Sequence, residues 1–289
     1  MGEPFVCVAV KPVAPVIEVD WRTGGVRLDE RHLVRTPADA AACAIGARIA
    51  AALGVEVVVV AVAGPRSLDV LRTALAEGAA RAMRVVVGDE DLDDVGPETQ
   101  WPSAVVAGAL AELCADASVV VCGDASGDRG SSTVPPLLAQ RLGVPQALGL
   151  RTAAIDDGRV LAVRRLDAGR RERLAIDPPC VISVEAGAAT PPRAPLPDVV
   201  GLGEGRGQLT EHRVPAPAGA RRGDPAGTVL GPYRPRASDV AAPIERGAVR
   251  RAIEVAGTLS RRDPPEVVRL DPDEAAVAIL ERLERWGMR

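Results

Sequence analysis

Short β-branched runs alternate with helical patterns along roughly the first half of the chain. The near-continuous valine run at residues 55–62 is typical of a strand buried on both faces of a parallel sheet. We predict four strands of this kind, at residues 5–10, 55–62, 84–87 and 119–122. Apolar residues with a helical period predict helices between them, at residues 37–53, 67–77 and 103–114. This βαβ alternation predicts an α/β fold with a doubly wound, mostly parallel sheet.

The helix expected at residues 37–53 carries signals at both of its ends. Thr36 is a favoured N-cap residue, Pro37 suits the first helical position, and Asp39 suits the positive end of the helix dipole. Gly54 follows the last apolar position and predicts where the helix ends.

The pattern of apolar residues changes after Gln146. Strand-like segments separated by Asp-Asp-Gly and Asp-Ala-Gly turns predict an added β-meander, at residues 148–155, 159–164 and 171–176. A further strand is expected at residues 179–184. A separate hairpin is expected near the start of the chain, where residues 16–19 and 26–28 flank a Thr-Gly-Gly turn.

The C-terminal third of the chain has a different composition. Residues 187–266 are rich in Pro, Gly, Ala and Arg, which predicts an extended arm with a flexible insertion. An amphipathic helix follows Asp271, and its apolar stripe must be buried on the core or on another subunit. We therefore divide the chain into an α/β domain, residues 1–186, and an extended C-terminal arm that ends in a helix, residues 187–289.

The composition limits the kinds of partner. Hydrophobic residues make up 47% and charged residues 26% of the chain, which argues against intrinsic disorder. The net charge of -4 gives no overall basic field for nucleic acid, and 2% aromatic residues leave little material for base-stacking platforms. We therefore expect no nucleic-acid partner.

The cysteines and the first apolar run bear on metals and on location. None of the 5 cysteines belongs to a C-x-x-C pair, so metal-site spacing is absent and buried free thiols in a reducing cytoplasm are expected. The first apolar run, residues 5–10, is too short for a signal peptide or a membrane span. We expect a cytoplasmic protein with no metal site and no membrane insertion.

The most informative stretch for function is the Gly- and Ser-rich segment at residues 123–136, which follows the fourth strand and leads into a helix. Backbone N–H groups of such a loop, with hydroxyl donors beside them, form an anion site at the carboxyl end of a strand. The alternative is that the loop only turns the chain and caps the helix. The segment is not a P-loop, because no lysine is present to reach a phosphate. The candidate binding residues here are Gly123, Asp128, Arg129, Gly130, Ser131, Ser132, Thr133 and Val134.

The segments that follow the first two strands, and the start of the first helix, add further candidates. Small residues there would let the backbone approach an adenine ring or ribose, although each segment taken singly is more often an ordinary turn. These candidates are Ala9, Val10, Lys11, Thr36, Pro37, Ala38, Asp39, Ala63 and Gly64. We find no nucleophile–base pair, since His32 and His212 lack motif neighbours, and we expect no catalytic side chains.

Several segments resemble the electron transfer flavoprotein beta subunit. They are residues 8–12, residues 64–82, the loop that closes at residues 143–146, and residues 181–200, which resemble the recognition loop of that family. The C-terminal helix also fits, so the resemblance covers nearly the whole chain. Among relatives, the chain looks most like the divergent actinobacterial form associated with mycofactocin systems.

The resemblance implies a Rossmann-like fold of the adenine nucleotide hydrolase type. It implies a heterodimer with an alpha subunit that carries most of the FAD, and electron transfer from a dehydrogenase to a downstream acceptor. This subunit would hold a structural AMP or a second FAD at the candidate residues above, without side-chain catalysis of its own. Leu196 matches the leucine that docks into the partner dehydrogenase.

The chain also departs from the family pattern. Residues 36–39 replace an Asn-Pro-aromatic segment, and residues 129–134 replace an Asp/Asn/Gln-rich run. Residues 213–264 are longer than the family norm. One alternative is a stand-alone protein that binds or senses adenine nucleotides. A nucleotide-activating ligase is disfavoured, because Lys11 and the residues after it stand where such enzymes have a Ser-Gly-Gly loop.

Overall fold

The computed structural model describes residues 3–28, 33–88, 100–200, 207–223, 244, 247–255 and 267–286. The chain divides into two compact units, Met1–Tyr233 and Arg234–Arg289. The boundary that composition predicts at residue 187 stays a prediction.

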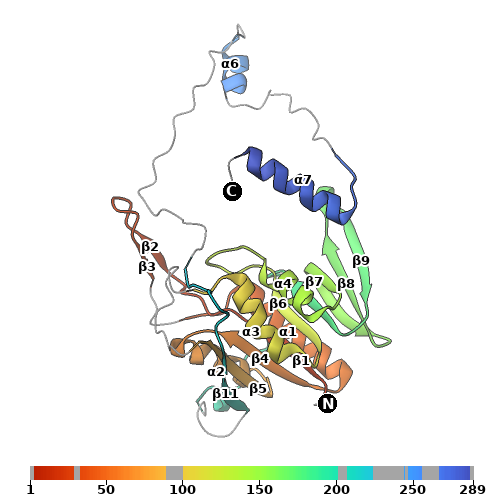
Figure 1. Ribbon diagram of the computed structural model, residues 1–289. Helices are drawn as coiled ribbons and strands as arrows, with labels where there is room; N and C mark the ends of the chain where they lie inside the picture. Colours follow the sequence, from red (N-terminus) through yellow and green to blue (C-terminus); the bar gives the residue numbers. More distant parts are fainter. Residues whose placement is uncertain are drawn as a thin grey trace. The chain divides into compact units, whose positions relative to one another are not determined.

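One sheet of nine strands organises the first unit (Figure 1). Its strands are β1 (Phe5–Ala9), β4 (Glu56–Val62), β5 (Arg81–Val87), β6 (Ala117–Gly123), β7 (Gln146–Asp156), β8 (Arg159–Arg165), β9 (Arg171–Ile176), β10 (Cys180–Val184) and β11 (Gln208–Val214). They lie in the order β11-β5-β4-β1-β6-β10-β7-β8-β9. β8 is antiparallel to both β7 and β9, and the other pairs are parallel. The predicted mostly parallel sheet with an added meander is therefore confirmed.

Helices cover both faces of this sheet, which makes it doubly wound as predicted. They are α1 (Pro37–Leu53), α2 (Leu68–Ala76), α3 (Ser103–Cys114) and α4 (Val134–Leu142). Val6 and Val8 of β1 belong to the core formed with α1 and α2, whereas Cys7 and Ala9 belong to the core formed with α3 and α4. This alternation explains the near-continuous apolar runs, because successive side chains of a strand point to opposite faces.

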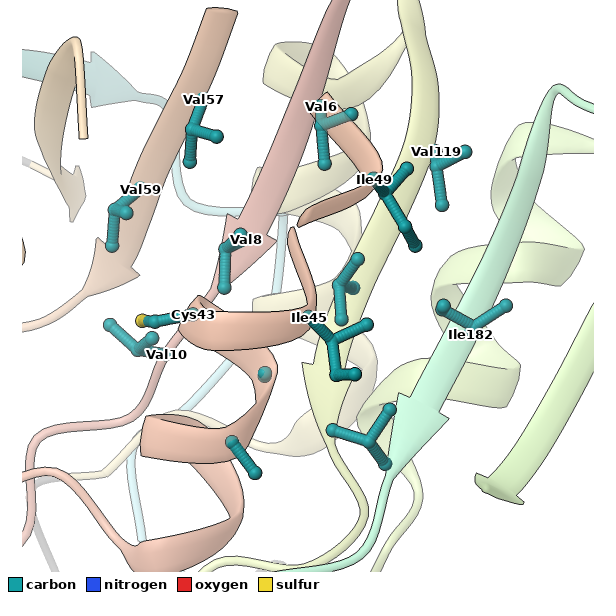
Figure 2. Packing of buried hydrophobic residues seen from close by; sticks show 14 of the residues in the cluster. Val6, Val8, Val10, Cys43, Ile45, Ile49, Val57, Val59, Val119 and Ile182 are labelled. Atoms are coloured by element: carbon teal, nitrogen blue, oxygen red, sulfur yellow. The ribbon is translucent and has the colours of Figure 1, made fainter. Parts of the chain in front are cut away.

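The helix α1 packs closely on the middle of the sheet. Ile45 and Ile49 point from α1 toward the side chains of β1, β6 and β10 (Figure 2). A Cβ added at Gly46 would lie 2.4 Å from Val8 Cγ2, so a glycine is needed for this close approach. The predicted end signals are also confirmed, since Thr36 Oγ1 accepts a hydrogen bond from Asp39 N and Gly54 has a φ of 68°.

The strand β11 was not predicted. It lies inside the segment that composition assigns to an extended arm, and it pairs in parallel with β5 at the edge of the sheet. The prediction of an arm is therefore wrong for Gln208–Val214. Gly207 introduces the strand with a φ of 74°, and Val214 ends it with a buried side chain.

The other elements among the described residues are a hairpin, three α-helices and two short 3-10 helices, Pro65–Ser67 and Asp167–Gly169. The predicted hairpin is confirmed as β2 (Ile17–Val19) and β3 (Val26–Leu28), which form a separate antiparallel pair. The short helix α5 (Leu196–Val200) belongs to the first unit. The second unit contains α6 (Ala248–Val255) and α7 (Pro272–Arg285), and Asp271 caps α7 as predicted. Among the residues described, no helix has the length and apolar character to cross a membrane.

Candidate functional site

A cavity opens at the carboxyl ends of the central strands. The chain passes from β1 to β4 and β5 on one side, and later to β6 and β10 on the other, so the strand order reverses between β1 and β6. Ala9 and Cys122 are partners at this reversal, and both line the cavity. The cavity has a volume of about 190 Å³. Ligands of open α/β sheets bind at such a switch point, so the fold alone makes this the candidate site.

The structure brings most of the predicted binding residues to this cavity. Those that line it are Ala9, Val10, Lys11, Asp39, Ala63, Gly64, Gly123, Arg129, Ser131, Ser132, Thr133 and Val134. Five predicted residues are not part of the lining: Thr36, Pro37, Ala38, Asp128 and Gly130. Of these, Thr36 caps α1, and Asp128 holds a lining residue in place.

Lys11 and Asp128 form an ion pair beside the cavity. Lys11 Nζ donates to Asp128 Oδ2 at 2.6 Å and to Gln100 Oε1 at 3.1 Å, and Gln100 Nε2 donates to the same Asp128 oxygen at 2.9 Å. Burial acts to raise the pKa of Asp128, but the hydrogen bond and charge of Lys11, with hydrogen bonds from Ser126 and Gln100, hold that pKa well below its usual value. Asp128 therefore stays ionised and neutralises much of the Lys11 charge.

Asp39 is a buried carboxyl group at the start of α1. Only 5% of the residue is exposed, and Oδ2 accepts a hydrogen bond from Lys11 N at 3.2 Å. Burial raises the pKa of Asp39 to about 6, although the hydrogen bonds from Lys11 and Thr36 act in the opposite direction. A Cβ added at Gly123 would lie 2.6 Å from Asp39 Oδ1, so the end of β6 needs a glycine to approach this helix.

The loop after β6 presents hydroxyl groups to the cavity. Ser131 Oγ lies 3.1 Å from Thr133 Oγ1, and Ser131, Ser132 and Thr133 are exposed. Ser132 has a φ of 54°, a left-handed backbone conformation that few residues other than glycine adopt readily. No side chain caps the start of α4, and Pro135 and Pro136 lack N–H groups in its first turn. Ser131, Ser132 and Thr133 therefore add hydroxyl donors to this part of the wall, beside the guanidinium group of Arg129.

Sequence reasoning missed an aromatic part of the wall. Trp101 precedes α3, and the guanidinium carbon of Arg222 lies 4.7 Å from the centroid of the Trp101 ring. Both residues line the cavity. The remaining lining residues are Pro12, Leu33, Val62, Val85, Val86, Val87, Gln100, Ser103, Val106, Leu110, Cys122, Asp124, Ala125, Ser126 and Pro135. Most follow from the rule that strand ends and helix starts form such sites, but nothing in the sequence pattern indicates Arg222.

The cysteines are buried and free. Cys7 Sγ lies 3.3 Å from Cys114 Sγ, and this hydrogen bond together with burial raises the pKa of Cys7. Burial also raises the pKa of Cys122, so neither thiol is suited to act as a nucleophile near neutral pH. Within the described ranges, His, Cys, Asp and Glu side chains form no group of three that could hold a metal ion.

The other candidate residues lie away from the cavity lining. Leu196 begins α5 and is 73% exposed. His212 lies in β11 and is exposed, whereas the sequence placed it in the extended arm. His32 lies outside the described residues.

Comparison with known proteins identifies similar chains. A family model described as "Electron transfer flavoprotein domain" matches residues 27–217. The chain is 32% identical over 113 residues to the electron transfer flavoprotein subunit beta of Mycobacterium leprae. This matched stretch covers 39% of this chain and 41% of that protein. It is 31% identical over 128 residues to the corresponding subunit of Syntrophomonas wolfei, covering 44% and 47%, and 31% identical over 145 residues to the mitochondrial subunit of Oryza sativa, covering 50% and 55%. The matched part thus spans about half the length of these relatives.

Proposed function

Because this chain belongs to the electron transfer flavoprotein domain family, we propose that it acts as a beta-type subunit beside an FAD-carrying alpha subunit. The pair would move electrons from a dehydrogenase to a downstream acceptor in the cytoplasm. FAD supplies the redox chemistry when it is bound, and this chain contributes binding and orientation rather than catalytic side chains. We further propose the mycofactocin-associated actinobacterial form of the family.

The observation that carries the proposal is the cavity at the reversal between β1 and β6. Small residues, Ala9, Ala63 and Gly64, leave room beside the strand ends, and the Ser131–Thr133 hydroxyl groups supply donors for a phosphate. These hydroxyl groups do not cap α4, which argues against the alternative of a purely structural turn. The donor set therefore fits an adenine nucleotide.

The size of the cavity favours the smaller of the two nucleotides considered. Its volume of about 190 Å³ is too small to surround the whole of FAD. AMP is much smaller than FAD, which contains AMP as one half. We therefore propose AMP as the nucleotide of this subunit, with FAD shared with the alpha subunit.

Two exposed apolar features support partners. No residue of α7 is buried, and its apolar stripe includes Ile279 and Leu280 and continues to Trp286 just after the helix. We propose that the alpha subunit covers this stripe. Leu196 is held between Pro195 and Pro197, which restrict the backbone and lower the entropy lost on docking. We propose that Leu196 docks into the dehydrogenase.

A stand-alone adenine-nucleotide binding or sensing protein is the second candidate. One observation favours it. The described residues that line the cavity all belong to the unit Met1–Tyr233, so this unit alone can contact a bound nucleotide. Co-expression with an alpha-type subunit separates the two candidates, because only the first predicts a stable yellow complex.

The test is the nucleotide released when the purified complex is denatured. We expect AMP in amounts equal to this chain, together with FAD. Replacing Ser131, Ser132 and Thr133 by Ala should lower AMP occupancy, since each lost hydroxyl bond to a charged phosphate costs about 1.5–3 kcal/mol. Thr73→Ala, which removes an exposed hydroxyl group from α2, is the control and should leave occupancy unchanged. Full AMP occupancy in the triple variant would contradict the site.

A further inference from the structure

The two ends of the cavity differ in chemistry. β5 lies three strand spacings from β6, which is about 14 Å along the sheet edge. The loop that follows β6 offers the hydroxyl groups of Ser131, Ser132 and Thr133. The wall near β5 is apolar and aromatic, because Trp101 packs there on the cluster that includes Val85 and Val87. A ligand with one anionic end and one flat end matches this polarity.

Arg222 reaches the aromatic end by way of β11. Because β11 is parallel to β5, it delivers the following residues to the same edge of the sheet. The segment from Val214 to Gly223 is held at both ends, since Gly88 N donates to Val214 O at 2.8 Å and Gly223 N donates to Gln100 O at 2.9 Å. Arg222 therefore lies at a defined place on the wall.

Three cations line the described part of the cavity. Lys11 is paired with Asp128 at 2.6 Å, Arg129 is exposed to solvent, and Arg222 lies over an aromatic ring. The Arg222 guanidinium lies over the Trp101 ring, which favours a planar arrangement with one face on the indole. The other face of a guanidinium held in this way can stack on a second aromatic ring.

We propose that Arg222 recognises the base of the bound nucleotide, with Trp101 as the residue that positions it. This inference rests on the proposed function and goes beyond it by assigning the base end of the ligand to the β5 side of the cavity. The phosphate then points to the Ser131–Thr133 loop. Stacking on the base makes the contribution of Arg222 independent of the phosphate.

The test compares AMP with adenosine by calorimetry on the full-length protein, with any co-purified partner, after nucleotide removal. Arg222→Ala should lower the affinity for both ligands by the same factor, about tenfold or 1.4 kcal/mol. The triple Ala variant of Ser131, Ser132 and Thr133 should weaken AMP and leave adenosine unchanged. Arg222→Lys keeps the charge without the planar group and should bind as poorly as the Ala variant. Arg221→Ala, at the exposed neighbouring position, is the control and should bind normally.

The outcomes distinguish the inference from the function on which it rests. If Arg222→Ala weakens AMP but not adenosine, Arg222 contacts the phosphate and the inference is wrong. Unchanged affinities in Arg222→Ala, or full affinity in Arg222→Lys, also overturn it, while AMP binding by the unaltered protein still supports the proposed function. Failure of the unaltered protein to bind either ligand overturns both.

Discussion

Asp39 links the start of α1 to the cavity wall. Its backbone N–H is held by the Thr36 cap at 3.1 Å, and its carboxyl group accepts from Lys11 N. The residue types at residues 36–39 were enough to predict the helix start, because capping depends on neighbours in the sequence. The burial that raises the pKa of Asp39 depends on the end of β6, more than 80 residues away, and could not be predicted from these residues.

The raised pKa of Asp39 predicts a pH dependence of stability. Burial raises the pKa from 3.8 to about 6, so the folded protein binds this proton more tightly than the unfolded chain. The free energy of unfolding contributed by Asp39 therefore falls as the pH rises from about 4 to about 6, and stays level above that range. Asp39→Asn removes this pH-dependent contribution. The free energy of unfolding of the variant, measured relative to that of the unaltered protein, should therefore rise by up to about 3 kcal/mol between pH 4 and pH 7.

Urea unfolding across this pH range measures the effect. Asp69→Asn is a matched control, since Asp69 also lies in the first turn of a helix but its side chain is 82% exposed. The control should follow the pH profile of the unaltered protein. Parallel profiles for Asp39→Asn and the unaltered protein would show that Asp39 titrates normally.

At the scale of elements, the strands of the core were predictable and β11 was not. The core strands have near-continuous apolar runs, because both of their faces are covered by helices. β11 has a single buried residue, Val214, and its pairing with β5 joins segments 127 residues apart, as in the ion pair of Arg84 with Glu211. An edge strand whose order depends on a distant partner leaves little signal in its own sequence. Arg222 was missed for the same reason.

Gly207 provides a test of the entry into β11. It has a φ of 74°, and an added Cβ would lie 2.6 Å from Leu75 Cδ2 and 3.1 Å from Ala80 O. Gly207→Ala should destabilise the unit by about 1–3 kcal/mol more than the backbone conformation alone would cost, because the backbone oxygen cannot move aside cheaply. Hydrogen exchange of the amides in Gln208–Val214 should also increase.

The chain offers a matched control for this crowding. Gly219 has a φ of 76° and no heavy atom within 4 Å of an added Cβ, so Gly219→Ala carries the conformational cost without the contact. Urea unfolding compares the stabilities of the two variants, and hydrogen exchange compares the protection of β11 in each. Equal stabilities and unchanged exchange in β11 would mean that Leu75 and Ala80 do not restrict the strand entry.

At the scale of the whole molecule, the exposed apolar side chains among the described residues include Leu196 and Leu280. Leu196 lies in the first unit and Leu280 in the second, at 73% and 48% exposure. A buried leucine contributes about 1.5–3 kcal/mol relative to an exposed one, so a partner that covers either residue gains that much. The sequence predicted the apolar stripe of α7 from its helical pattern, whereas Leu196 was identified only through the family resemblance. The identity of both partners rests on the family.

Leu196→Ala and Leu280→Ala should each weaken the interaction with a different proposed partner. Leu280→Ala should weaken association with the alpha subunit about tenfold or more, which sedimentation can measure, because a lost apolar contact of this size exceeds 1.4 kcal/mol. Leu196→Ala should leave that association intact and slow electron transfer from the dehydrogenase several-fold. Each variant is the control for the other, and neither should change the melting temperature of the chain alone, since both side chains are exposed. If Leu196→Ala lowers the melting temperature while the intact fraction accepts electrons normally, Leu196 is structural and the dehydrogenase docks elsewhere.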